Sequence, residues 1–81
     1  MKVSVEVSLY PLTEEFIPVI KGFIERLHVY PEIRVETNTM STQIFGDYDT
    51  ILDLLKNELK DVFYTNKAVC VMKIIGKPEA I

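Results

Sequence analysis

The chain has 81 residues and a formal net charge of −3, and its basic residues form no cluster, which argues against a nucleic-acid-binding protein. Cys70 is the only cysteine and His28 the only histidine, so an internal disulfide and a Cys/His metal cage are both excluded. The length predicts one domain, residues 1–81, with a core small enough to need reinforcement by a partner.

The first strand is predicted over residues 2–10, because apolar and polar residues alternate there. Pro11 ends this strand, since proline has no N–H to donate to a ladder. The alternation is unlike the continuous apolar run of a signal peptide, and no segment approaches the ~20 apolar residues of a membrane span. We therefore expect no membrane insertion and a cytoplasmic location.

The first helix is predicted to begin at Thr13, a good N-cap, with Glu14 and Glu15 in its first turn. Pro18 either bends that turn or delays the start of the helix. The helix should stop before Pro31. Its apolar residues follow helical spacing: Phe16, Ile17, Val19, Ile20, Phe23, Ile24 and Leu27.

The second half of the chain begins with two further alternating segments, 33–37 and 40–46, which predict a pair of strands. Asp47 is a suitable N-cap for a second helix that ends at Asn66, and residues 67–76 predict the last strand. The second helix carries one apolar stripe: Ile51, Leu52, Leu54, Leu55, Leu59, Val62 and Phe63.

The predicted element order is β-α-β-β-α-β with two amphipathic helices. Right-handed crossovers then place both helices on one face of an antiparallel sheet with strand order 4-1-3-2. The chain is therefore predicted to be an α+β protein with a ferredoxin-like sandwich fold.

The last strand is apolar on both of its faces, which predicts burial on both. The helices cover one face only, and Tyr10 and Phe45 also fall on the other, open face by phase. A second copy of the chain is the simplest cover, so we expect a homo-oligomer, a dimer or a tetramer, formed through the open sheet face.

Candidate catalytic groups are few. His28 lies near a helix end and Cys70 among apolar strand residues, so neither is placed as a nucleophile or base, and no glycine-rich phosphate loop is present. Thr42 shares the phase of Met40 and Ile44, so its hydroxyl should face the helices and need a partner. That partner is either nearby backbone or a small polar ring bound close to Leu9 and Tyr10.

Two segments resemble the YkoF-like family of proteins that bind thiamine or its hydroxymethylpyrimidine part. They are SLYPLTEEFIPVI (8–20) and MSTQIFGDYDTILDLL (40–55), and the resemblance extends from about Val3 to Phe63. It implies a cytoplasmic ferredoxin-like domain that catalyses no reaction, needs no cofactor or metal, and pairs through its sheets. Association with a transporter of thiamine precursors is a further expectation from the family.

The resemblance also implies a set of ligand-binding residues. The ligand is expected to contact Leu9, through its backbone, and Thr42, with Ser8, Tyr10 and Ser41 as further candidates. The alternative to thiamine binding is an oligomeric ligand-sensing or scaffold domain of the ferredoxin-like type with a different ligand.

Overall fold

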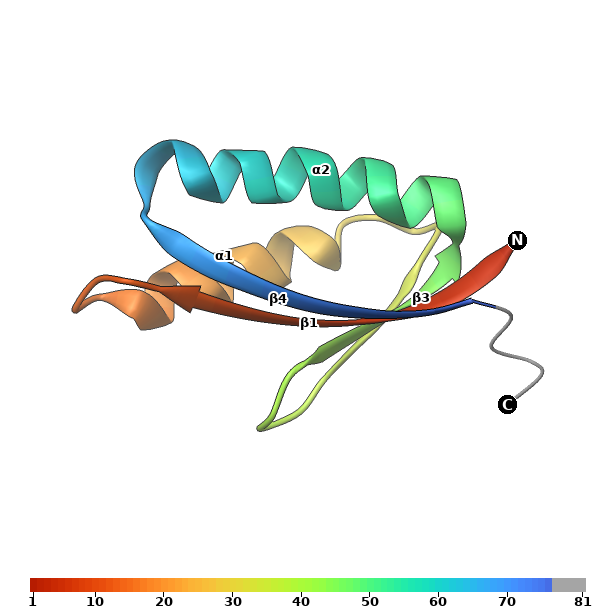
Figure 1. The fold of residues 1–81 in the computed structure, drawn as a ribbon, viewed down its shortest axis with the longest axis horizontal. Helices are drawn as coiled ribbons and strands as arrows, with labels where there is room; N and C mark the ends of the chain where they lie inside the picture. The colour runs from red at the N-terminus through yellow and green to blue at the C-terminus, as the bar shows by residue number, and fades with distance from the viewer. Residues whose placement is uncertain (77–81) are drawn as a thin grey trace.

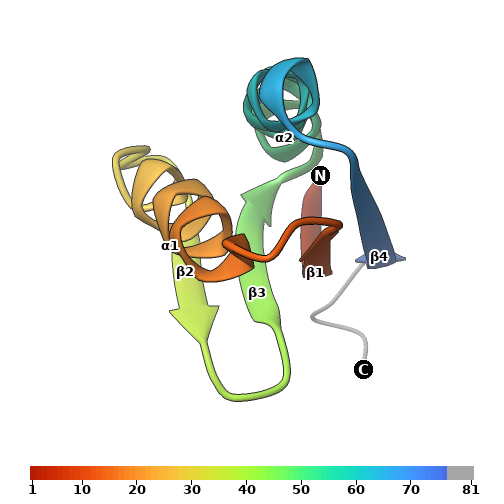
Figure 2. The same cartoon turned by 90° about the vertical axis from the view of Figure 1, so that its left-hand side faces the viewer.

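The computed structural model describes residues 1–76, which form six elements. They are β1 (Lys2–Pro11), α1 (Phe16–Leu27), β2 (Arg34–Thr37), β3 (Thr42–Asp47), α2 (Tyr48–Thr65) and β4 (Ala68–Gly76). The strands form one antiparallel sheet in the order β2-β3-β1-β4, and both helices lie on one face of it (Figure 1, Figure 2). This confirms the predicted ferredoxin-like α+β fold, since the strand order is 4-1-3-2 counted from the other edge.

The core lies between β1 and the two helices. Alternate residues of β1 are buried against the helices, as their phase predicted, and β3 adds Ile44 at 0 % exposure. The buried apolar residues are Val3, Val5, Val7, Leu9, Phe23, Leu27, Ile44, Ile51, Leu54, Leu55 and Val62. The central strand β1 is therefore held on its helix side along most of its length.

The start of α1 follows one of the two predicted alternatives, a start delayed by Pro18, and not a start capped by Thr13. The helix begins at Phe16 with Glu15 as its N-cap residue, so Thr13 is not the cap and no acidic residue lies in the first turn. The reason is Pro18, which cannot donate an intrahelical hydrogen bond. With the later start Pro18 is the third helical residue, where the N–H has no helical partner in any case.

Asp47 is the N-cap residue of α2, as predicted, but its side chain makes no capping hydrogen bond among the described residues. Its Oδ1 instead accepts a hydrogen bond of 3.1 Å from the terminal amine of Met1, because Lys2 and Asp47 are register partners in the sheet. This bond lowers the pKa of the Asp47 carboxyl. The predicted end of α2 at Asn66 is correct.

The two helices are joined by a polar cluster at the end of α1. Arg26 Nε donates to Glu58 Oε1 at 2.7 Å, and the Tyr30 hydroxyl donates to Glu58 Oε2 at 2.6 Å. The hydrogen bond to Glu58 raises the pKa of the Tyr30 hydroxyl, with a smaller contribution from burial.

Neither helix in the described part of the chain is long and apolar enough to cross a membrane.

Strand β4 is largely exposed on both faces within one chain. The prediction left the open face to a second copy of the chain, but it expected the helices to cover the other face. It is an edge strand. Ala68 and Cys70 near its beginning pack against the core, whereas Met72 and Ile74 on its helix side remain 41 % and 46 % exposed. Val69, Val71 and Ile75 on the open face are 47–48 % exposed. Other predicted core residues are exposed too: Phe16, Ile17, Met40 and Phe63.

Candidate functional site

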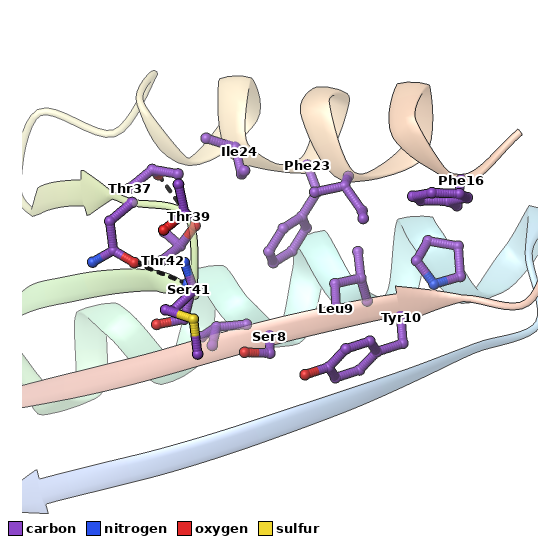
Figure 3. Close-up of a pocket in the computed structure, with 15 residues that line it drawn as sticks. Ser8, Leu9, Tyr10, Phe16, Phe23, Ile24, Thr37, Thr39, Ser41 and Thr42 are labelled. Carbon is purple, nitrogen blue, oxygen red and sulfur yellow. Dashed lines mark hydrogen bonds between the residues drawn. The ribbon is translucent and has the colours of Figure 1, made fainter.

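A cavity of about 360 Å³ opens between the end of β1, helix α1 and the loop that joins β2 to β3 (Figure 3). Helix α1 supplies one wall with Phe16, Ile20, Phe23 and Ile24, which are spaced i, i+4, i+7 and i+8 on one helix face. Residues 37–42 supply the opposite wall, and residues 7–11 of β1 the floor. The cavity therefore has apolar side chains from one helix facing polar side chains from a loop.

The floor of the cavity contains a strand edge that lacks a strand partner. The ladder between β1 and β3 ends at the pair Val7–Thr42, whereas the ladder between β1 and β4 continues to Pro11–Ala68. Beyond Val7, the side of β1 that faced β3 is therefore unpaired among the described residues. Alternate residues of a strand direct their N–H and C=O groups to such an edge, so backbone donors and acceptors are available to a bound molecule.

Thr42 lies at the end of the β1–β3 ladder, next to the unpaired edge of β1. It is 5 % exposed and is the buried polar side chain of the described core. Its Oγ1 lies 3.1 Å from Oγ1 of Thr37 across the hairpin, and either hydroxyl can be the donor. The partner of Thr42 is thus a hydroxyl rather than backbone. Because a hydroxyl has one donor and two acceptor sites, Thr42 retains capacity for a second hydrogen bond.

The loop wall is shaped by Asn38. Its Oδ1 accepts hydrogen bonds from the backbone N–H of Met40 at 2.9 Å and of Ser41 at 3.1 Å. Its own N–H donates to the carbonyl of Ser41 at 3.0 Å, and its Nδ2 donates to Gln43 at 3.2 Å. Met40 therefore belongs to this loop and is 84 % exposed, instead of lying in β3 as predicted.

The five predicted site residues all line this cavity, but from different sides. Leu9 is 7 % exposed and points toward α1, with Thr42 on the same side of the sheet (Figure 3). Ser8 and Tyr10 direct their side chains to the side of β1 away from α1, so they offer only backbone to the interior. Ser41 donates its hydroxyl to Glu6 Oε2 at 2.9 Å.

Comparison with known families gives one match that covers nearly all of the described residues. The profile of the YKOF-related family matches residues 2–75. The chain belongs to the YKOF-related family. A comparison with curated proteins found no match.

Several solved structures share the fold of this chain. A hypothetical protein of Methanocaldococcus jannaschii is 33 % identical with a TM-score of 0.81, over 96 % of this chain and 82 % of that one. A Streptococcus pneumoniae protein is 25 % identical with a TM-score of 0.86, over 100 % and 93 %. A Thermotoga maritima protein, named as a candidate thiamine biosynthesis or salvage protein, is 23 % identical with a TM-score of 0.86, over 100 % and 89 %.

The sequence interpretation of this YKOF-related chain missed the helix wall and Asn38. The spacing of Phe16, Ile20 and Phe23 predicts an apolar helix face, but the pattern alone does not tell a core face from a cavity wall. In the structure this helix face lies over the end of β1 without filling the space between them, so Phe16, Ile20, Phe23 and Ile24 line the cavity. The signal for Asn38 was its place between two alternating segments, where asparagine side chains bond backbone N–H groups of turns.

The groups that most often carry catalysis lie elsewhere. His28 is the exposed C-cap residue of α1, and Cys70 lies half-buried on β4, where burial raises the pKa of its thiol. Among residues 1–76, no group of three or more His, Cys, Asp or Glu side chains is placed to hold a metal ion. A second hollow is lined only by side chains of α2, from Lys56 to Tyr64, and lacks polar groups converging from other elements.

Proposed function

We propose that this YKOF-related protein binds thiamine, or its hydroxymethylpyrimidine part, in the cavity between β1, α1 and the β2–β3 loop, and that it catalyses no reaction. The observation that carries the proposal is the unpaired edge of β1 beyond Val7, beside the buried hydroxyl of Thr42. A pyrimidine with ring nitrogens and an exocyclic amine offers acceptors and donors in one plane, which suits a strand edge and a hydroxyl.

The walls of the cavity suit a flat ring. Phe16, Phe23 and Ile24 can contact a ring face, and a volume of about 360 Å³ lies within the range of about 300–1,000 Å³ for small-molecule sites. Among the described lining residues there is no histidine, cysteine or carboxylate to act as a nucleophile or base. Family membership and the name of the Thermotoga maritima protein support a thiamine-related ligand. We extend the proposal to a role in the cytoplasm, linked to uptake of thiamine precursors.

Calorimetric titration of the purified protein with hydroxymethylpyrimidine and, separately, with thiamine tests the proposal. We expect saturable heat with one or both ligands at or below millimolar concentration. A pyrimidine that keeps the hydroxymethyl group but lacks the exocyclic amine is the matched control, and it should bind more weakly because one hydrogen bond is lost. Absence of binding by both ligands at millimolar concentration would show that thiamine recognition is wrong.

A second candidate function, an oligomeric sensing or scaffold domain with a different ligand, rests on β4. Exposed apolar patches mark contact surfaces, and β4 has Val69, Val71 and Ile75 exposed on the open face. We propose that a second copy covers this face, so assembly as a dimer or tetramer is expected under both candidates. Ligand binding separates them, since only the first requires a thiamine-type ring.

Light scattering at micromolar protein tests the assembly. We expect the mass of a dimer or tetramer, and we expect Val71→Lys to reduce it because a lysine placed in an apolar contact loses its hydration. Val29→Lys is the matched control, since Val29 is 76 % exposed beyond the end of α1 and away from β4. A monomeric mass for the unchanged protein contradicts the assembly in both candidates.

A further inference from the structure

The cavity is uncharged in the part of the chain that the structure describes. Its polar side chains are hydroxyls and the Asn38 amide, and none of its lining residues is Lys, Arg, Asp or Glu. A bound phosphate group in a protein is normally met by lysine or arginine or by several backbone N–H groups. The side chains here supply none of the positive charge that a phosphate needs.

The beginning of α1, which lies at the cavity, does not replace those charges. Helix N-termini attract anions through their free N–H groups, but Pro18 removes the N–H of the third helical residue. Glu14 and Glu15 immediately precede the helix and are exposed. Their negative charges oppose the partial positive charge of the helix end. This end of α1 is therefore poorly suited to an anion.

The charged side chain that is bonded to the loop is also negative. Glu6 accepts the hydrogen bond from Ser41, a lining residue, and Gln43 Nε2 donates to the same Ser41 Oγ at 2.7 Å. Lys73 approaches Glu6 at 3.8 Å but is 79 % exposed, so solvent screens it. The donor capacity of Ser41 is already used by Glu6 and is not free for a phosphate oxygen.

From these charges we infer that the cavity distinguishes ligands by phosphorylation, accepting the free ring alcohol and rejecting its phosphate ester. The inference rests on the proposed function, because it concerns the same cavity and the same pyrimidine. A phosphate attached to the hydroxymethyl group would enter with the ring and lose water without gaining a cationic partner. The protein would then handle the unphosphorylated compound, upstream of any kinase that adds phosphate to it.

Parallel calorimetric titrations with hydroxymethylpyrimidine and with its phosphate ester test this inference. We expect the ester to bind at least about tenfold more weakly, which corresponds to about 1.4 kcal/mol. Equal or tighter binding of the ester overturns the phosphate discrimination and leaves the proposed function intact. Binding of neither compound overturns the proposed function and the discrimination with it.

A charge placed at the cavity mouth tests the cause of the discrimination. Met40 lines the cavity and is 84 % exposed, so a longer polar side chain fits there. Met40→Lys should narrow the ratio of the two dissociation constants severalfold, whereas the matched control Met40→Gln should leave the ratio unchanged. An unchanged ratio in Met40→Lys means that rejection does not arise from missing positive charge, and the electrostatic account is then wrong.

Discussion

Replacing Phe23 with alanine is expected to lower the free energy of unfolding by about 3–5 kcal/mol. Phe23 is 2 % exposed and lies where the core meets the cavity, so the substitution loses apolar burial and leaves a void. A domain of this size has roughly 3–5 kcal/mol available from its core, so the net stability falls to near zero and a large fraction of the molecules should unfold at room temperature. Urea denaturation followed by circular dichroism measures the change.

Phe63→Ala is the matched control for Phe23→Ala. Phe63 lies on α2, also a helix, but is 47 % exposed, so its replacement should cost about 1 kcal/mol or less. Both variants need one fixed protein concentration, since assembly adds to apparent stability. Equal destabilisation by the two substitutions would contradict the placement of the core between β1 and the helices.

Thr42→Val is expected to weaken binding of the pyrimidine by about 1–3 kcal/mol, roughly 5- to 150-fold in Kd. Valine has nearly the shape of threonine, so the packing of β3 against the helices should remain. The hydroxyl that stands beside the free edge of β1 is lost, and the ligand atom that it contacted is then buried without a partner. Calorimetry gives the affinity, and denaturation confirms that the variant folds.

Thr37→Val separates ligand contact from hairpin structure. It removes the same hydrogen bond of 3.1 Å between the two threonines but keeps the hydroxyl of Thr42. Its effect on Kd should therefore be smaller than that of Thr42→Val, because Thr37 is exposed and its role is to orient Thr42. If Thr42→Val binds as tightly as the unchanged protein, Thr42 does not contact the ligand.

The fold could be predicted because local patterns and chain connectivity agree. The alternation of β1 identified both its burial and its face, and Pro11 marked where the strand ends. The antiparallel pairing of β3 with β1 then predicts that Thr42, at the start of β3, lies near the end of β1. In the structure the ladder pairs Thr42 with Val7. The end of β1 and the position of Thr42 together indicate where the candidate site lies. Both could be predicted because they depend on periodicity and topology alone.

Other features depend on tertiary geometry that periodicity does not contain. The sequence left two starts open for α1, and the choice between Thr13 and a start delayed by Pro18 is settled only in the folded chain, where the helix begins at Phe16. The side chain of Asp47 bonds Met1 instead of its own helix because the sheet register brings the two together. A helix stripe cannot reveal that some of its apolar side chains line a cavity above the end of β1.

The last strand illustrates a different limit. Its two apolar faces predict that β4 is covered on both, but the pattern does not say whether the cover comes from the same chain. Within one chain β4 is an edge strand and remains exposed. Its apolar pattern therefore supports the proposed contact with a second copy.

The central claim is that a pyrimidine binds at the free edge of β1 beside Thr42. Amide chemical-shift mapping during a titration with hydroxymethylpyrimidine tests this claim most directly. The account predicts that the largest shifts fall on residues 8–10 and 38–42, with smaller shifts in the first turns of α1. Largest shifts between Lys56 and Tyr64, around the second hollow, or no shifts at millimolar ligand, would contradict the account.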